Sequence, residues 1–306
     1  MIKILFNYCH PGFFNNFLRI PDCEFYHLVD QDTKRMDVSG LKNVTVPEAL
    51  DLHPDLFVES WHSLLIKRRR LFRNIPMIFI EHTAPRDHGH VIIWGRIKKD
   101  NSKKIIYITH SSVEEWGEVE SCKHIVIPHA IDFENYKPWD GSEGFVMSVV
   151  NEFRQRDWCC GQSLWKEVTK DFKDVRLYGN GNELIPRSQG PRHKEDLVDL
   201  YKSCGVFLNT SLKSPLPMVV LEAASSGCPI VTTNTCELGR IFHNGFDAFV
   251  SDPTNIEQMK RDVDILLTHK DKAKEIGINA RKMVEENFRL ELFIERWKKV
   301  LEDIVR

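Results

Sequence analysis

The chain has 306 residues, of which 42% are hydrophobic, and its formal net charge is −2. This length exceeds what a single hydrophobic core usually supports, so we expect two domains. Because the net charge is near zero, the protein as a whole does not attract polyanions such as nucleic acids electrostatically. Its eight cysteines form no CxxC pair, which predicts reduced thiols in a cytoplasmic protein. No apolar stretch approaches the length of a membrane span, which leaves peripheral membrane contact open.

The first half alternates short apolar runs with helical patterns, which predicts a parallel sheet covered by helices, with ligands at the carboxyl ends of its strands. We expect strands at Ile2 to Phe6, Glu24 to Val29, Asp55 to Val58, Met77 to Ile80, Ile105 to Thr109 and His124 to Ile127, and helices around Trp61 to Phe72 and Ser112 to Glu120. Residues Asp132 to Gly144 contain one proline and two glycines and are the most linker-like stretch, so we expect the hinge there.

The most informative stretch is Cys204 to Thr233, which predicts a strand, a loop, a helix and a second strand. Pro217 suits the first helical turn and Gly227 the residue just past the helix end. Between Met218 and Ala224 the one polar side chain is Glu222, and a carboxylate in such surroundings needs a hydrogen-bonding partner. The helix start offers free N–H groups to a diphosphate. Together these features predict a nucleotide-sugar site.

This stretch and four other segments, taken in their order along the chain, resemble the sequence motifs of a known family. They are VIPHAID (126–132), RLYGNGN (176–182), EDLVDLYKSCGVFLNTS (195–211) and ENFRLELFIERWKKVLEDI (286–304). The set is similar to the group 1 glycosyltransferases, which are retaining enzymes that use UDP-, GDP- or ADP-sugars.

The resemblance implies an α/β fold of the GT-B type, with two facing Rossmann-like domains, a cleft between them and a C-terminal helix that crosses back. The implied domains are residues 1–138, which bind the acceptor and include the helix at 290–306, and residues 139–289, which bind the nucleotide-sugar. Phe293 to Val305 carries an apolar stripe that fits the crossing helix.

The family also implies where the donor diphosphate is held. Its members carry an arginine and a lysine after a strand that matches SVVN (148–151). Here Asn151 stands at the arginine position and Arg156 at the lysine position, with Arg154 as an alternative. An arginine keeps the positive charge and can bind phosphate through two parallel hydrogen bonds.

Other donor-binding residues follow from the resemblance. Glu222 matches the residue that accepts hydrogen bonds from the ribose, and Leu216, Pro217 and Met218 match the segment at the diphosphate and sugar. Gly190 matches the loop at the nucleobase, and Gly12 would let the backbone approach the donor. The family signature pairs two glutamates with seven residues between them, but the first position here holds Ser214. This departure puts the sugar identity in doubt and makes loss of activity conceivable.

His82 ends the predicted strand IPMIFIEH, where the family carries a histidine that faces the donor sugar. It is the candidate catalytic residue, and the alternative is a local capping role. The resemblance implies retention by front-face attack, in which the leaving phosphate takes the acceptor's proton. No cofactor and no metal are expected, so Asp30 and Asp32 are interpreted as solvated acids.

The acceptor is the least determined part. The segment from Lys67 to Lys104 contains eleven Lys and Arg residues and three acidic residues, so its net charge is +8. Arg86, His88 and His90 in this segment are the candidate acceptor-binding residues. The charge is consistent with an anionic acceptor, namely a lipid-linked phosphate, a membrane surface or modified DNA, and equally with a solvated basic face.

Three functions therefore compete. The first is a transferase that acts on glycan or glycolipid acceptors, and the second is a transferase that modifies hydroxylated bases in DNA. The third is a catalytically silent subunit that binds nucleotide-sugars, which the missing first glutamate permits.

Overall fold

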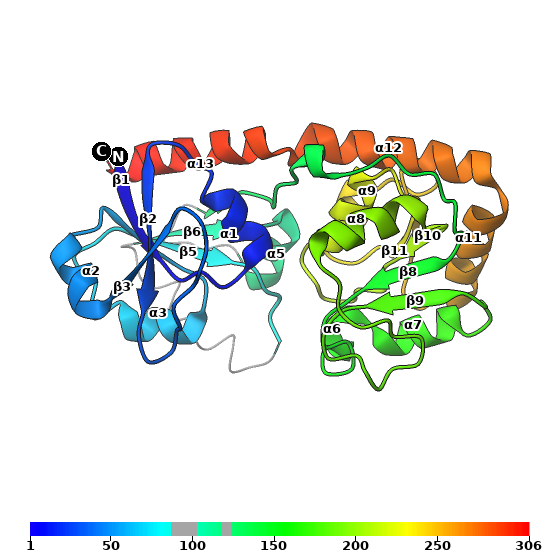
Figure 1. The fold of residues 1–306 in the computed structure, drawn as a ribbon, viewed down its shortest axis with the longest axis horizontal. Helices are drawn as coiled ribbons and strands as arrows, with labels where there is room; N and C mark the ends of the chain where they lie inside the picture. Colours follow the sequence, from blue (N-terminus) through cyan, green and yellow to red (C-terminus); the bar gives the residue numbers. More distant parts are fainter. Residues whose placement is uncertain (87–102, 118–123, 306) are drawn as a thin grey trace. The chain divides into compact units, whose positions relative to one another are not determined.

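The computed structural model describes residues 1–86, 103–117 and 124–305, and the chain divides into two compact units (Figure 1). Unit 1 contains Met1–Ala130 together with Leu290–Arg306, and unit 2 contains Ile131–Arg289. Both chain ends lie in unit 1, and each unit has a parallel sheet with helices on both faces (Figure 1).

The sheet of unit 1 has the strand order β3-β2-β1-β4-β5-β6-β7, and every neighbouring pair is parallel. Its strands are β1 (Ile2–Phe6), β2 (Cys23–Val29), β3 (Leu41–Thr45), β4 (Leu56–Glu59), β5 (Met77–Glu81), β6 (Lys103–Tyr107) and β7 (His124–Val126). The helices described in this unit are α1 (Pro11–Phe17), α2 (Val46–Leu52), α3 (His62–Arg68), α5 (His110–Trp116) and α13 (Leu290–Val305). Since β1 has β2 on one side and β4 on the other, the topological switch point lies beside β1.

Alternating residues of the strands build two hydrophobic layers in unit 1. Ile4 and Phe6 of β1 lie in the layer that also contains the aromatic residues of α1. Leu5 lies in the opposite layer, together with residues of α2, α3 and α5. Trp297 of α13 is fully buried in the first layer, so the last helix of the chain completes the core of unit 1.

The sheet of unit 2 has the order β12-β11-β10-β8-β9 and is also parallel throughout. Its strands are β8 (Val146–Val149), β9 (Val175–Tyr178), β10 (Val206–Leu208), β11 (Ile230–Thr233) and β12 (Phe249–Ser251). The longer helices are α7 (Gln162–Thr169), α8 (Lys194–Ser203), α9 (Met218–Ser225), α11 (Ile256–Thr268) and α12 (Lys270–Phe288), and the short ones are η1 (Phe133–Asn135), α6 (Asp157–Cys160) and α10 (Leu238–Ile241). One layer of the core involves α8, α9 and α12, and the other involves α7 and α11.

The predicted strands are all present, with ends that differ by up to two residues. The helix predicted from Trp61 to Phe72 is shorter, since α3 ends at Arg68. The helix predicted from Ser112 to Glu120 begins earlier, at His110, and ends at Trp116 before Gly117, which has a φ of 75°. Among the described elements of unit 1, three were not predicted, namely α1, β3 and α2.

The hinge prediction for Asp132 to Gly144 is wrong, because this stretch is fastened to unit 2. The N–H of Trp139 donates to the carbonyl of Ser226, and the N–H of Asp140 donates to the carbonyl of Lys202. Tyr136 lies in the core of unit 2. Residues 131–138, assigned above to the first domain, therefore belong to the second, and the chain changes units between Ala130 and Ile131 and again between Arg289 and Leu290.

Two smaller observations concern the class of protein. The seven cysteines within the described residues are free thiols. Among the helices that the structure describes, none combines the length and apolarity that a bilayer span needs.

Candidate functional site

In unit 2 the predicted donor residues gather around the carboxyl ends of β8, β9 and β10. Asn151 follows β8, and its Oδ1 accepts a hydrogen bond from the N–H of Asn180, which follows β9, at 2.9 Å. Gly179 precedes Asn180 with a φ of 131°, and any Cβ there would overlap the carbonyl of Val150. The β8 and β9 loops therefore approach each other more closely than side chains would permit.

Gly190 lies over the end of β9. Its carbonyl accepts the N–H of Gly179 at 3.1 Å, and its φ is 71°, in the region that favours glycine. A Cβ at this position would meet nothing within 4 Å, so the loop presents open backbone there. This placement brings Gly190 into the same neighbourhood as Asn151, as the sequence analysis expected of one site.

Arg156 is the residue directly before α6 and is half-buried, whereas Arg154 is exposed. The guanidinium of Arg156 lies near the thiol of Cys159. The pKa of that thiol is lowered to about 6, chiefly by a hydrogen bond with Cys160 and further by the charge of Arg156. The two arginines thus differ in setting, and Arg156 is the one held beside the sheet.

The loop that carries Ser214 is tied to α6. The N–H groups of Leu212 and Lys213 both donate to the carbonyl of Cys159, at 2.8 and 3.0 Å. Ser214 itself is half-buried. Arg156 directly precedes α6, and the loop that carries Ser214 is hydrogen-bonded to the same short helix.

The start of α9 differs slightly from the expectation. Pro217 caps the helix with a φ of −65°, and the first helical residue is Met218. The side chain of Leu216 is buried in the core, so only its backbone can contact a ligand. Because Pro217 has no N–H, the free donors at this helix start come from the residues after it.

Glu222 has the partner that its apolar surroundings required. The hydroxyl of Tyr201 on α8 donates to its Oε2 at 3.1 Å. The hydroxyl of Tyr136 interacts with the same carboxylate and, within the described residues, is buried without a hydrogen-bond partner. Burial raises the pKa of Glu222, and the charge of Lys194 acts in the opposite direction. Glu222 is therefore a desolvated carboxylate with a tyrosine hydroxyl bound to it.

In unit 1 the structure places His82 within a group of three imidazoles. The His82 ring lies 4.5 Å from that of His10 and 6.3 Å from that of His129, measured between centroids. The Nε2 of His82 lies 3.3 Å from the hydroxyl of Ser60, which follows β4. These residues come from the carboxyl ends of β1, β4, β5 and β7, where a parallel sheet of this kind binds ligands.

Two of the three imidazoles, His82 and His129, are uncharged near neutral pH. Burial lowers the pKa of His82 well below its ordinary value, and the charges of His10 and His129 lower it further. Burial, with a contribution from His10, lowers the pKa of His129 to about 3. Neutral His82 can therefore donate or accept a hydrogen bond without presenting a charge.

The sequence analysis missed His10 and His129, and it missed Tyr136 and Tyr201 around Glu222. The signal for His129 was present in VIPHAID, where a histidine follows a predicted strand as His82 does. For Tyr201 the signal was an aromatic residue on the buried side of its helix. Only the folded structure shows that His10 and His129 lie beside His82 and that the two tyrosines lie beside Glu222.

The remaining predicted residues are less connected. Gly12 lies exposed in the first turn of α1, two residues after His10. Arg86 is exposed, and His88 and His90 lie outside the described residues.

Of the two acids expected to be solvated, Asp32 is exposed, whereas the side chain of Asp30 is only 10% exposed. Arg68 is fully buried, and its guanidinium donates to Asp30 at 2.9 Å and to Glu59 at 2.7 Å. The Nζ of Lys67 lies 2.5 Å from Asp32. Part of the basic segment thus serves the core of unit 1, because a buried guanidinium needs carboxylate partners.

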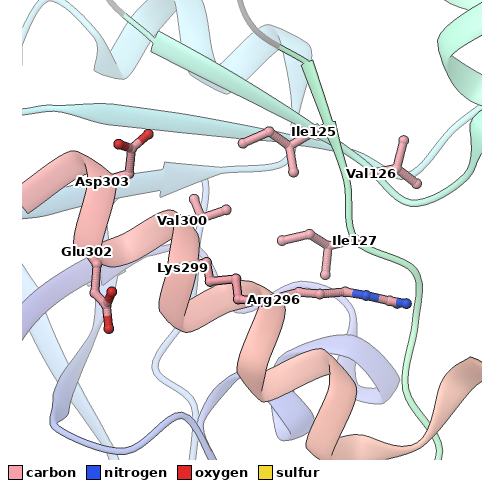
Figure 2. A pocket seen from close by; sticks show the side chains of 8 residues that line it. All are labelled: Ile125, Val126, Ile127, Arg296, Lys299, Val300, Glu302 and Asp303. Carbon is pink, nitrogen blue, oxygen red and sulfur yellow. The ribbon is translucent and has the colours of Figure 1, made fainter.

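A separate pocket of unit 1 lies between β7 and α13 (Figure 2). Figure 2 shows apolar side chains, among them Ile125 and Val300, beside the charged Arg296 and Asp303. None of the predicted site residues lines it, so we do not assign it to the donor or to the histidine group.

Solved structures of other proteins share this fold. Sucrose-phosphate synthase from Thermosynechococcus elongatus has a TM-score of 0.80 at 11% identity, with 99% of each chain covered. Alr3699/HepE from Anabaena in complex with UDP and glucose has a TM-score of 0.78 at 14% identity, covering 99% of this chain and 100% of that chain. At such identities the likeness concerns the fold alone, which is an α/β fold of the GT-B type with two Rossmann-like units.

Part of the sequence is similar to a known family. Residues 178–283 match the family described as glycosyl transferases group 1, which confirms the resemblance found in the sequence. A Haemophilus influenzae protein described as an uncharacterized glycosyltransferase is 25% identical over 178 residues, or 51% of this chain. The match spans 48% of that protein, about half its length.

Proposed function

We propose that the protein transfers a sugar from a nucleotide-diphosphate sugar, most readily a UDP-sugar, to a glycan or lipid-linked acceptor with retention of configuration. The observation that carries this proposal is the position of Glu222. It lies on α9, the first helix after the Ser214 loop, where it accepts a hydrogen bond from Tyr201 inside the segment that matches group 1 glycosyltransferases. The UDP and UDP-glucose complexes of Alr3699/HepE support the choice of donor.

Roles follow from the settings of the residues. Glu222 accepts hydrogen bonds from the donor ribose, and Tyr201 orients its carboxylate. Arg156 and the free N–H groups at the start of α9 stabilise the charge that develops on the departing diphosphate. Neutral His82 donates a hydrogen bond to the sugar. The leaving phosphate takes the proton of the acceptor hydroxyl, so we assign no cofactor and no metal to the reaction.

The test is release of nucleoside diphosphate from a panel of UDP-, GDP- and ADP-sugars by the purified protein, with and without a chelator. We expect turnover of at least one donor, unaffected by the chelator, and a changed donor ranking in Ser214→Glu. A carboxylate accepts two strong hydrogen bonds from a sugar diol, whereas a hydroxyl makes weaker ones. Donor binding without any turnover would favour the silent subunit, and an identical ranking would remove Ser214 from sugar recognition.

We also propose peripheral contact of this cytoplasmic enzyme with an anionic membrane surface. After Lys67 and Arg68 are used in ion pairs, Arg70 and Arg73 remain exposed beside the exposed apolar residues Ile66 and Leu71. A pocket lined by Ile66, Arg69, Arg70 and Arg73 lies in this patch. Cosedimentation with phosphatidylglycerol vesicles should be lost in Arg70→Glu/Arg73→Glu. Equal binding by the variant, or binding of duplex DNA instead of vesicles, would contradict the membrane assignment.

A further inference from the structure

Two adjacent cysteines lie on the short helix α6, directly after Arg156. The Sγ atoms of Cys159 and Cys160 are 3.6 Å apart, and the Sγ of Cys159 lies 3.4 Å from the carbonyl oxygen of Arg156. Each cysteine is 5% exposed, so a small reagent can reach the pair more readily than a protein can. Neither thiol has a role in the proposed transfer reaction.

The two thiols differ in how readily they lose a proton. A hydrogen bond with Cys160 and the positive charge of Arg156 lower the pKa of Cys159 to about 6, so this sulfur is mostly a thiolate at neutral pH. The hydrogen bond with Cys159 and burial raise the pKa of Cys160, which therefore keeps its proton. The thiolate is the nucleophilic form of cysteine, and a thiolate beside a cation and a second thiol is typical of oxidation-sensitive sites.

A second pair of thiols provides an internal reference. The Sγ atoms of Cys204 and Cys228 are 3.2 Å apart, closer than those of the first pair. Both residues are fully buried in the core of unit 2, and burial raises the pKa of Cys228 well above its ordinary value. A fully buried thiol with a raised pKa is a poor nucleophile, so we expect this pair to react far more slowly.

The peptide unit between Cys159 and Cys160 also holds the loop that carries Ser214. Its carbonyl, which belongs to Cys159, accepts two N–H groups of that loop at 2.8 and 3.0 Å. Its N–H, which belongs to Cys160, donates to the carbonyl of Arg156 at 2.7 Å. Consecutive Cα atoms are about 3.8 Å apart, whereas most disulfides join Cα atoms about 4.4–6.8 Å apart. A bond between the two sulfurs therefore forces this peptide out of its helical geometry and disturbs both sets of hydrogen bonds.

We infer that Cys159 and Cys160 form a redox modification site, at which hydrogen peroxide produces a disulfide that weakens nucleotide binding by displacing Arg156 and the Ser214 loop. The modification itself is independent of the proposed function, whereas its effect on nucleotide binding rests on that function.

The chemistry proceeds in two steps. The Cys159 thiolate attacks one peroxide oxygen, the O–O bond breaks, and the products are a sulfenic acid and hydroxide, which takes up the proton that the Cys159 thiol had released. The Cys160 sulfur then forms the S–S bond, and the sulfenic oxygen leaves as water with the proton of the Cys160 thiol. Two thiols and one peroxide thus give one disulfide and two waters.

The first measurement locates the disulfide. The reduced protein is treated with equimolar hydrogen peroxide, the remaining thiols are alkylated, and tryptic peptides are mapped by mass spectrometry. Cleavage after Arg156 and Lys166 leaves the pair in one peptide, 157–166, whereas Cys204 and Cys228 fall in different peptides. We expect peptide 157–166 to lose two hydrogen atoms and to escape alkylation before any other cysteine reacts.

Single variants test the two steps. In Cys160→Ser the second thiol is absent, so peroxide should leave a sulfenic acid at Cys159 that dimedone traps. In Cys159→Ser neither the disulfide nor the sulfenic acid should form. Cys23→Ser, a half-buried cysteine of unit 1, is the matched control and should give the same oxidised peptide as the wild type.

The second measurement follows the affinity for UDP, GDP and ADP on the same samples. For the nucleotide that binds best, affinity should fall about tenfold or more when the wild type is oxidised, because an arginine contact to phosphate is lost. The affinity should return after reduction with dithiothreitol. Cys159→Ser should keep its affinity in the presence of peroxide.

The outcomes separate this inference from the proposed function. Absence of binding of all three nucleotides by the reduced wild type contradicts the proposed function. Full alkylation of peptide 157–166 after peroxide treatment, or earlier linkage of Cys204 to Cys228, overturns the modification site. A disulfide between Cys159 and Cys160 that leaves nucleotide affinity unchanged overturns the effect on binding.

Discussion

Burial of Glu222 disfavours its charged form, which is the form that our proposal assigns to ribose binding. The raised pKa of Glu222 means that folding disfavours its charged form. A charged carboxylate would accept stronger hydrogen bonds from a ribose than a neutral carboxyl group would. Glu222→Gln keeps an oxygen for the Tyr201 hydroxyl but removes the charge. We expect the free energy of unfolding at pH 7 to be unchanged or higher, and the affinity for the nucleotide-sugar to fall about tenfold or more, since hydrogen bonds to charged groups contribute about 1.5–3 kcal/mol.

Isothermal titration and urea unfolding measure both quantities. Glu285→Gln, an exposed position on α12, is the matched control and should change neither. A loss of stability without a loss of affinity in Glu222→Gln would show that Glu222 is a structural residue.

Arg154 and Arg156 form a natural pair of variants, because both lie on the same turn but differ in burial. Arg156→Ala should weaken binding of the nucleoside diphosphate more than Arg154→Ala does, since the half-buried guanidinium is less screened by solvent. Titration with UDP decides the ranking. The reverse order would assign the diphosphate to Arg154. It would also show that Arg156 does not match the family's lysine position after β8.

The buried imidazole of His129 predicts a pH dependence of stability. Its folded pKa of about 3 is below the ordinary value, so the unfolded chain binds more protons in the window from about pH 6.5 down to 3. The free energy of unfolding should therefore fall as the pH drops through this window, by about 2 kcal/mol from this group at pH 5, because one pKa unit corresponds to about 1.4 kcal/mol.

Urea unfolding of the wild type and His129→Asn at pH 7.5 and pH 5 measures this contribution. The variant should lose less stability between the two pH values. Equal losses would mean that His129 does not titrate as its burial implies.

At the scale of elements, close backbone packing connects α12 to the end of α9. Gly277 of α12 has no room for a Cβ, which would overlap the carbonyl oxygen of Gly227. Alanine gains about 1 kcal/mol in helix propensity, but overpacking costs about 1–3 kcal/mol and a backbone carbonyl cannot turn aside. We expect Gly277→Ala to lower the melting temperature by roughly 2–4 °C for each kcal/mol lost.

The neighbouring Ile278 is 57% exposed, and Ile278→Ala serves as the control. A Gly277→Ala protein as stable as the control would indicate that α12 can shift away from α9 at little cost.

The sequence allowed prediction of the elements whose pattern is local. β10 is an uninterrupted apolar run, β1 is apolar except for Lys3, and α9 is bounded by Pro217 and Gly227. It did not predict α1, whose seven residues include three buried phenylalanines, because Pro11 and Gly12 at its start are also typical of a turn. The stretch from Asp132 to Gly144 looked like a linker because its hydrogen bonds are made to residues 60 to 90 positions away, which local composition cannot show.

The candidate site divides in the same way. Glu222 was predicted because it is the one polar side chain within an apolar helical stretch, and His82 because it ends an apolar strand that the family resemblance matches. Tyr136, Tyr201, His10 and His129 were not predicted as site residues, since their contacts depend on which strands become neighbours. Asp30 was misinterpreted as solvated because burial of its partner Arg68 is a property of the packed unit and leaves no mark in the spacing of charges.

At the scale of the whole molecule, the central claim is that unit 2 binds a nucleotide-sugar through the Glu222 site. Thermal unfolding in the presence of UDP-, GDP- and ADP-sugars tests it most directly, because a ligand present at a hundred times its Kd stabilises the native state by about 2.7 kcal/mol. The account predicts that at least one nucleotide-sugar raises the melting temperature of the wild type and raises that of Glu222→Ala much less. No shift with any nucleotide-sugar, or equal shifts in the two proteins, would contradict it.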